Sequence, residues 1–277
     1  MCSSRGLFRK DSAKPRLIHR TVRCRADGLL RYCEAPGLNA RTPHANQLIA
    51  TLPAAERTAL LAACETHDLT LSQVLGEPQD RIAYAYFPTT GFVSLIARVD
   101  QDAIEVNMVG SEGMVGLPLA LGVATTTLYT VVQGAGTTLR IAAEAFRAQL
   151  ARSPGLQRSL SCYAAVMLAQ LAQTGACTRF HHVEERVARW LAMTRDRAGA
   201  SDFHLTHEFL SAMLGVRRVG ITGAAQALQR RGLISYRRGN VHVADRAGLQ
   251  AAACSCYRLD REMYAKLMEE CRAAGDS

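Results

Sequence analysis

The feature that most constrains the fold lies between Leu205 and Val243, near the C-terminus. Two short segments with helical apolar spacing meet at Gly215, and two short alternating segments follow them. Glycine lets the chain turn sharply after a helix, because it adopts positive φ without strain. Thr206 is placed to cap the first helix. This order predicts a helix-turn-helix followed by a β-hairpin, the winged arrangement that reads duplex DNA.

The segment after Gly215 is expected to form an amphipathic helix. Its apolar positions recur at helical spacing and suit packing on the preceding helix; they are Ile221, Ala224, Ala225 and Leu228. The opposite face combines an arginine and an amide with small side chains, which suits base edges in a major groove. The predicted base-reading residues on this face are Arg218, Val219, Thr222 and Gln226.

Positive charge gathers on the hairpin and at the ends of this helix. Residues 201–250 contain seven Lys and Arg against three Asp and Glu. The predicted phosphate contacts are Arg217, Arg237 and Arg238, the last two in the turn of the hairpin. Small helical hairpins with a glycine corner also occur in proteins that never bind nucleic acid. The basic hairpin that follows favours DNA binding over that alternative.

The N-terminal segment, residues 1–44, is expected to be a disordered basic tail. It carries ten Lys and Arg against three Asp and Glu, and so accounts for +7 of the formal net charge of +9. Non-specific contact with DNA and an inert extension both stay open for it. An organellar transit peptide is disfavoured, because Asp11, Asp27 and Glu34 interrupt the segment.

The middle of the chain is predicted to be a second folded domain followed by a long helix. In residues 45–153, short alternating runs are separated by Gly and Pro turns, which indicates an antiparallel barrel or roll. Residues 154–180 read as a long helix with a wide apolar stripe, which favours a dimer seam over an ordinary core helix. The predicted dimer residues are Leu160, Tyr163, Met167 and Leu171. No membrane span is expected, because polar side chains interrupt both long uncharged stretches.

Three motifs in this order resemble the Crp-Fnr family of bacterial transcription regulators. They are YFPTTGFVSL with GSEGMVGLPLALG (86–95 and 110–122), FHHVEERVARWL (180–191) and LGVRRVGITGAAQALQRRGLI (214–234). The resemblance covers about residues 45 to 250. It implies an α+β fold: an antiparallel β-roll resembling a cyclic-nucleotide-binding domain, a dimerisation helix (154–180), and a winged helix-turn-helix (181–250) before a C-terminal helical extension (251–277). It also implies a cytoplasmic homodimer that binds double-stranded DNA, with RNA polymerase as a further candidate partner.

The sequence departs from the family pattern at both expected sites. Many members begin the recognition helix with Arg-Glu and carry a second Arg four residues later; here Val219 and Gly223 follow Arg218 at those positions. The resemblance places the effector pocket at Gly116, Leu117, Thr126, Thr127 and Leu171. Residues 99–139 contain no Lys or Arg, and the acids there are expected to repel a phosphate; they are Asp100, Asp102, Glu105 and Glu112. Ordinary binding of cyclic AMP is therefore not expected.

The remaining motifs predict no cofactor, no metal and no enzyme. Cys2, Cys24 and Cys33 lack the close spacing of an iron–sulfur ligand set, and Cys254-Ser255-Cys256 lacks the two-residue gap of a zinc knuckle. Free thiols are expected in a reducing cytosol. Nucleophile-elbow, zinc-protease and phosphate-loop motifs are all absent from the sequence. Two alternatives stay open: a dimeric scaffold that has lost specific DNA reading, and a regulator that responds to a cyclic nucleotide or to redox state.

Overall fold

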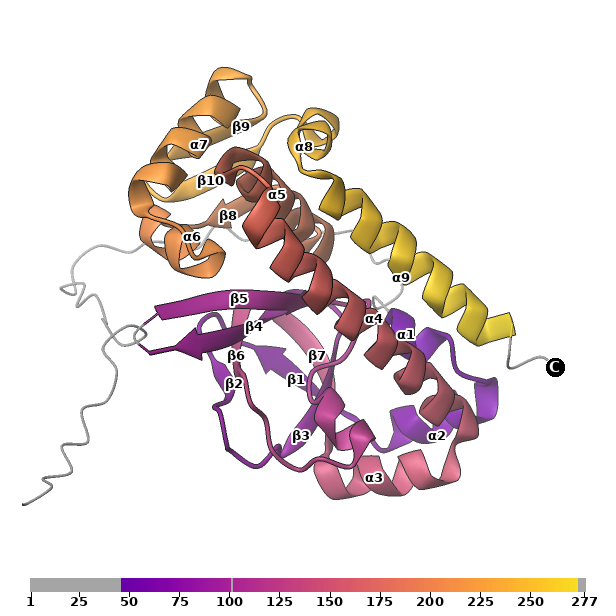
Figure 1. The fold of residues 1–277 in the computed structure, drawn as a ribbon. Helices are drawn as coiled ribbons and strands as arrows, with labels where there is room; N and C mark the ends of the chain where they lie inside the picture. The colour runs from indigo at the N-terminus through magenta and orange to yellow at the C-terminus, as the bar shows by residue number, and fades with distance from the viewer. Residues whose placement is uncertain (1–45, 101, 274–277) are drawn as a thin grey trace, which may run out of the picture. The chain divides into compact units, whose positions relative to one another are not determined.

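The computed structural model describes residues 46–100 and 102–273, all of which belong to one compact unit, Arg41–Ser277. The predicted N-terminal tail, residues 1–44, lies outside the described residues. Within the unit, the chain forms a β-roll, a long helix, a winged helix-turn-helix and a final pair of helices (Figure 1). This order confirms the predicted α+β fold class. No helix among the described residues is long and apolar enough to span a membrane.

Two antiparallel sheets form the roll. One has the strand order β1-β7-β3 and the other the order β2-β6-β4-β5. The strands are β1 (Glu65–Leu69), β2 (Val74–Gly76), β3 (Tyr84–Pro88), β4 (Phe92–Val99), β5 (Asp102–Val109), β6 (Tyr129–Gly134) and β7 (Gly136–Ala142). A short 3-10 helix, η1 (Leu117–Leu121), lies between β5 and β6. Residues 117–121 form a helical turn and not a strand, because Pro118 and the flanking left-handed Gly116 and Gly122 favour a turn there.

Three short helices share a core with the roll and the long helix that follows: α1 (Gln47–Ala50), α2 (Ala54–Ala62) and α3 (Ala143–Arg152). Asn46 fixes the entry of the chain into this layer. Its side chain accepts a hydrogen bond from the Ile49 amide at 3.1 Å and donates to the carbonyl oxygens of Pro88 and Gly113, at 3.0 and 2.8 Å. This buried, hydrogen-bonded amide ties α1 to the end of β3 and to the loop that follows β5.

The long helix α4 (Pro154–Phe180) packs its apolar stripe on the roll. Leu160, Tyr163 and Val166 are buried in a core shared with β3, β7 and α3. The last helix, α9 (Ser255–Ala273), lies along α4, as Figure 1 shows, and a disulfide joins Cys162 to Cys271. The expectation of free thiols throughout is therefore wrong for these two cysteines, because α9 returns over α4.

The C-terminal part begins with α5 (Val183–Ala198) and contains a small sheet of order β8-β10-β9. The remaining elements are β8 (Asp202–His204), α6 (His207–Leu214), α7 (Arg218–Arg230), β9 (Ile234–Arg237), β10 (Asn240–Val243) and α8 (Arg246–Ala252). Trp190 of α5, Ile221 and Leu228 of α7, and Leu249 of α8 share one buried core. Helix α5 thus forms the platform on which the helix-turn-helix and the hairpin are assembled.

Strand β5 of the roll contacts this platform through Glu105, which is half-buried. One carboxylate oxygen, Oε1, accepts a hydrogen bond from Trp190 Nε1 at 2.7 Å, and Ser94 donates to the other. Burial raises the pKa of the Glu105 carboxyl to about 7, although both hydrogen bonds act in the opposite direction. A titratable group therefore lies at the contact between the roll and α5.

Candidate nucleic-acid interface

Helix α7 presents the face predicted to read bases. Its apolar side is buried as expected, with Ile221 and Leu228 fully enclosed against α5 and α6. On the other side Arg218, Val219 and Gln226 are exposed, and the Val219 side chain is among the most exposed apolar groups described, at 82%. Its side chain belongs to none of the hydrophobic clusters of the described residues. It is available to a partner such as a thymine methyl group.

The turn before α7 has the geometry that its glycine indicates. Gly215 caps α6 with φ +60°, and a Cβ atom at this position would lie 3.0 Å from Ile104 Cδ1 on β5. At the other end of α6, Thr206 Oγ1 accepts a hydrogen bond from the Phe209 amide at 3.1 Å. Arg186 of α5 donates to the carbonyl oxygen of Leu214, one of the last carbonyls of α6. These contacts fix the angle between α6 and α7.

Among the predicted base-reading residues, Thr222 is the one whose side chain is hydrogen-bonded within the protein. Its hydroxyl lies 3.0 Å from His207 Nδ1 and donates to the Arg218 carbonyl oxygen at 3.1 Å. The hydroxyl is therefore not free to reach a base, because α6 already engages it. Gln226, in contrast, stays exposed with no side-chain hydrogen bond among the described contacts.

His207 connects the three parts of the candidate interface and was missed from the sequence. Its ring contacts Thr222 of α7 and stacks on Tyr236 of β9, with the ring centroids 4.6 Å apart. Tyr236 in turn donates a hydrogen bond to the Leu205 carbonyl oxygen at 2.5 Å. Burial, and then the nearby Arg218 guanidinium, lower the pKa of His207. No local sequence pattern indicates a role for this histidine, because its partners lie on α7 and on the hairpin and come together with it only in the fold.

The β9–β10 hairpin projects a basic tip. Arg238 and Gly239 form its two-residue turn with φ +50° and +83°, and Arg237 pairs with Asn240 across it. Positive φ at both turn positions is typical of a type I′ turn, where Asn-Gly is the favoured pair. The left-handed conformation strains an arginine at the first of these positions. Its presence there therefore indicates a role for its charge. Arg237 and Arg238 are both exposed.

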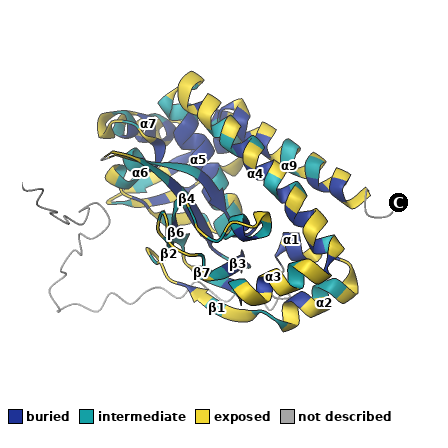
Figure 2. Ribbon diagram, turned by 60° about the horizontal axis from the view of Figure 1, so that its bottom comes forward, coloured by how far each residue is buried: buried dark blue, intermediate teal, exposed yellow. Residues whose placement is uncertain are grey.

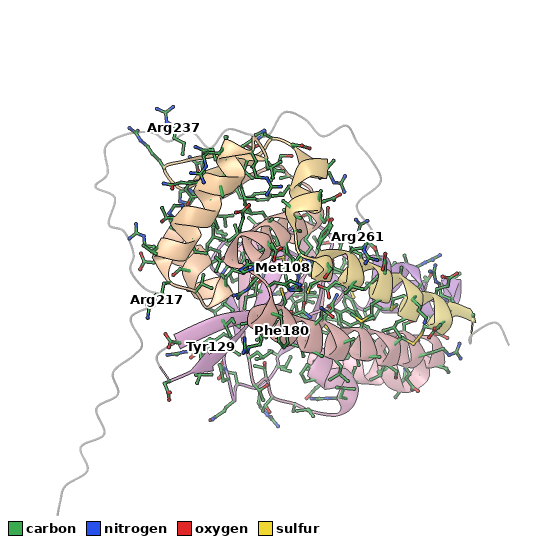
Figure 3. All side chains as sticks on the ribbon, turned by 45° about the horizontal axis from the view of Figure 1, so that its top comes forward. Met108, Tyr129, Phe180, Arg217, Arg237 and Arg261 are labelled. Atoms are coloured by element: carbon green, nitrogen blue, oxygen red, sulfur yellow. A yellow bond between two sulfur atoms is a disulfide. The ribbon has the colours of Figure 1, made fainter. Side chains whose placement is uncertain are left out.

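The three predicted phosphate contacts lie on the outer surface of this part of the chain. Arg217 is the N-cap residue of α7 and is exposed, and Figure 3 shows Arg217 and Arg237 projecting outward from the helix-turn-helix unit. Neither they nor Arg238 form an ion pair among the described residues. Arg231, further along, differs because it pairs with Glu184 at 2.9 Å.

A cavity of about 250 Å³ in the roll is lined by all five predicted effector residues. Gly116, Leu117, Thr126, Thr127 and Leu171 surround it together with mostly apolar neighbours from β3, η1 and α4.

The expectation that the four acids repel a phosphate at this cavity is wrong. None of the four acids lines it; Glu105 and Glu112 instead contact α5, through Trp190 and Arg197. A cation, Arg81, does line it, because a loop outside residues 99–139 reaches the cavity.

The predicted dimer residues on α4 are mostly enclosed within the chain. Leu160, Tyr163 and Met167 belong to the core beneath the roll, and Leu171 lines the cavity, so these side chains do not face a partner as expected. A different stripe is exposed along α4 (Figure 2). Its members are small or apolar and alternate at spacings of four and three; they are Ser161, Ala165, Leu168, Ala172 and Gly175. Spacing of this kind is the sequence signal for a helical seam. The larger apolar side chains on the neighbouring face of α4 hid this signal in the sequence.

Comparison with known proteins agrees with this geometry. Residues 185–252 match the family model of the Crp-like helix-turn-helix domain. No curated protein matches the sequence.

Several solved regulators share the fold. A putative transcriptional regulator of the Crp/Fnr family from Eubacterium rectale is 16% identical, with 74% of this chain and 96% of that chain covered and a TM-score of 0.58. FixK2 from Bradyrhizobium japonicum is 15% identical, with 69% and 98% covered and a TM-score of 0.58. The c-di-GMP-responsive global regulator CLP from Xanthomonas campestris is 19% identical, with 69% and 99% covered and a TM-score of 0.56. Residues 185–252 therefore match a Crp-like helix-turn-helix domain, and the chain as a whole has the fold seen in solved Crp/Fnr-type regulators.

Proposed function

We propose that the chain is a sequence-specific, DNA-binding transcription regulator that acts as a homodimer. The observation that carries the proposal is the exposed face of α7, which presents Arg218, Val219 and Gln226 beside the hairpin tip. The two arginines of that tip form no ion pair with any residue that the structure describes. A helix with these side chains suits the major groove, and the hairpin suits the adjacent phosphates. Such a protein would act by recruiting RNA polymerase to a promoter or by blocking its access.

The base-reading and phosphate-contacting roles can be separated by measurement. Arg218→Ala is expected to lower affinity for the selected operator by about 1–3 kcal/mol and to leave affinity for random DNA nearly unchanged. Arg237→Ala is expected to weaken binding to both DNAs and to reduce the salt slope by about one. Fluorescence anisotropy at several salt concentrations measures both effects, and Arg147→Ala, an exposed arginine on α3, is the matched control. Equal losses on operator and random DNA for Arg218→Ala would contradict the assignment.

The second candidate function, a scaffold that no longer reads DNA, is favoured by Val219 and by Gly223. These residues replace the charged pair that the family pattern places there, so α7 offers one charged group to bases where many relatives offer three. The same assay decides between the two functions. A scaffold would show no preference for any operator over random DNA.

The dimer is proposed to form through the exposed stripe of α4. Leu168 is 69% exposed at its centre, and a Cβ atom added to Gly175 would meet no atom within 4 Å. Two such helices can approach closely, because most of the side chains between them are small. Leu168→Glu is expected to yield a monomer in light scattering with size-exclusion chromatography. Leu71→Glu, at an exposed leucine in a turn of the roll, is expected to stay a dimer.

The effector of the roll is proposed not to be ordinary cyclic AMP. The described lining of the cavity is largely aliphatic and aromatic, and its one cation, Arg81, is exposed. A cyclic phosphate needs a cation and several donors in a protected position. Calorimetry of the full chain with cyclic AMP is expected to show no micromolar binding, and binding that Arg81→Ala abolishes would contradict the proposal.

A further inference from the structure

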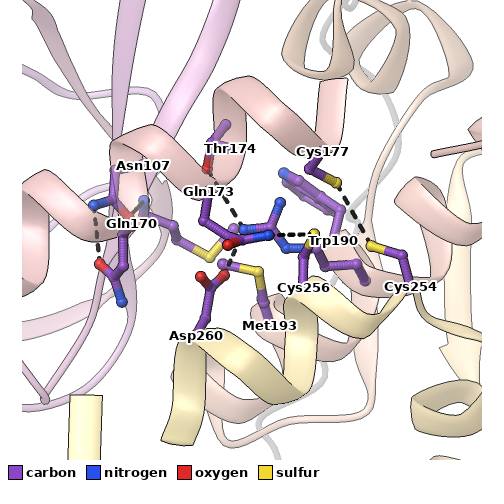
Figure 4. Close-up of polar contacts among 12 residues, drawn as sticks. Asn107, Gln170, Gln173, Thr174, Cys177, Trp190, Met193, Cys254, Cys256 and Asp260 are labelled. Atoms are coloured by element: carbon purple, nitrogen blue, oxygen red, sulfur yellow. Dashed lines mark hydrogen bonds and ion pairs between the residues drawn. The ribbon is translucent and has the colours of Figure 1, made fainter. Parts of the chain in front are cut away.

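Four side chains of the types that bind metals, three cysteines and one histidine, meet where α4 ends. Cys177 lies on the last turns of α4, His181 is its C-cap residue, and Cys254 and Cys256 flank the start of α9. Their ligand atoms all lie within 4.8 Å of one another. The Sγ atoms of Cys177 and Cys254 are 3.5 Å apart, and Cys256 Sγ is 3.4 Å from His181 Nδ1. Figure 4 shows Cys177, Cys254 and Cys256 converging from the two segments.

The sequence did not reveal this cluster, because its halves are separated by more than seventy residues. The sequence carried only partial signals. Cys177 and His181 stand one helical turn apart, and Cys254 and Cys256 stand on either side of Ser255, where α9 begins. Only the return of α9 along α4 brings the two pairs together.

We propose that Cys177, His181, Cys254 and Cys256 bind one zinc ion. Zinc prefers four tetrahedral ligands of this type, with Zn–S near 2.3 Å and Zn–N near 2.0–2.1 Å, so two ligand atoms on one ion stand at most about 4.6 Å apart. The observed separations fit a single ion with small adjustments. A multi-iron cluster places its thiolates on different iron atoms and needs wider spacing.

Burial distinguishes this cluster from thiols that only fill space. Cys177, Cys254 and Cys256 are buried, and His181 is half-buried beside them. A buried cysteine ordinarily packs as a small apolar group. Three thiols arranged around the nitrogen of an imidazole are not explained by packing, because apolar side chains would fill the same volume without any donor atoms.

Polar groups outside the cluster suit a bound metal with thiolate ligands. Gln173 Nε2 donates to Cys256 Sγ at 2.9 Å. The Arg189 guanidinium, which pairs with Asp260 at 2.5 Å, also interacts with Cys177 of the cluster. Three thiolates around one Zn²⁺ leave a single negative charge, which a neighbouring arginine offsets.

The site would join three parts of the molecule. His181 immediately precedes His182, the N-cap residue of α5, and the Cys254 amide donates to the Glu185 carbonyl oxygen on α5 at 3.4 Å. A metal at this position would fasten the start of α9 to the junction of α4 and α5. It would therefore stabilise the attachment of the DNA-binding part to α4, and this role does not depend on which DNA the protein reads.

The test uses the full chain purified in reducing buffer without chelator. Elemental analysis is expected to find one zinc per chain in the wild type and in Cys64→Ser, which removes a free cysteine outside the cluster. Cys254→Ser and His181→Ala are expected to weaken zinc binding by more than about 100-fold, beyond the 10–100-fold typical of losing an outer partner. Cobalt in place of zinc is expected to give the visible bands of a tetrahedral thiolate site in the wild type and in Cys64→Ser alone.

A measurement on the unmodified chain guards against variants that fail to fold. Removal of zinc by a chelator is expected to lower the melting temperature of the wild type, and added zinc is expected to restore it. His181→Ala keeps all three thiols and should show no such response while its circular dichroism stays that of the wild type. A metal-free chain with three titratable thiols, a Cys177–Cys254 disulfide, or an iron–sulfur chromophore would each overturn the proposal.

Discussion

Replacement of Glu105 by glutamine should make the protein less sensitive to alkaline pH. The ordinary pKa of this carboxyl is 4.5, and burial raises it to about 7. The folded chain therefore binds the proton more tightly than the unfolded chain does. The stabilisation is fully present below pH 4.5 and is lost as the pH rises through 7. At 1.36 kcal/mol per pKa unit, the whole shift is worth about 3 kcal/mol.

Glutamine is a close mimic of the protonated side chain. Its amide oxygen can accept the hydrogen bond from Trp190 Nε1, and its amide N–H can donate to Ser94 Oγ, which then accepts where it donates to the ionised carboxylate. The variant should consequently keep the contact between β5 and α5 without carrying a charge at any pH. Relative to the variant, we expect the wild type to lose about 2 to 3 kcal/mol of unfolding free energy between pH 5 and pH 8.

Urea denaturation followed by tryptophan fluorescence measures this difference directly, because Trp190 is the single tryptophan of the sequence and contacts Glu105. Glu144→Gln, at an exposed position on α3, is the control and should follow the wild type. If Glu105→Gln and the wild type lose the same free energy between pH 5 and pH 8, the assigned protonation of Glu105 is wrong.

Three further substitutions test the helix-turn-helix and its hairpin. Gly223→Ala should raise the unfolding free energy by about 1 kcal/mol, because glycine is a poor helix former and a Cβ there meets no atom within 4 Å; thermal melts without a gain would contradict this. Gly215→Ala should lower the unfolding free energy by about 1–2 kcal/mol, because alanine is strained at this positive φ and its Cβ atom crowds Ile104. An unchanged urea midpoint would contradict this. Arg238→Asn should relieve the left-handed turn residue, so stability should rise slightly while the salt slope of DNA binding falls by about one; an unchanged slope would show that Arg238 does not contact phosphate.

Local signals predicted the C-terminal part of the chain well. The cap at Thr206, the corner at Gly215 and the turn at Arg238-Gly239 each depend on a few neighbouring residues, so the sequence displays them directly. The same holds for the antiparallel strands of the roll, whose turns are marked by glycine and proline.

Features that depend on distant packing could not be predicted in the same way. Periodicity indicated an apolar stripe on α4, but it could not show that the roll, rather than a second copy, buries Leu160 and Tyr163. Likewise, the position of Glu105 in the sequence did not show that its side chain turns toward Trp190 and away from the cavity. Only the fold determines which surface covers each face.

Selection from a random DNA library, followed by footprinting of the enriched sites with the full chain, tests the central claim most directly. A dimer that presents one α7 to each of two successive major grooves should enrich a two-fold symmetric motif. Its half-sites should lie about 10–10.5 base pairs apart from centre to centre. Arg218→Ala should lose preference within each half-site. A library that yields no symmetric motif, or protection of a single unpaired half-site, would contradict the account.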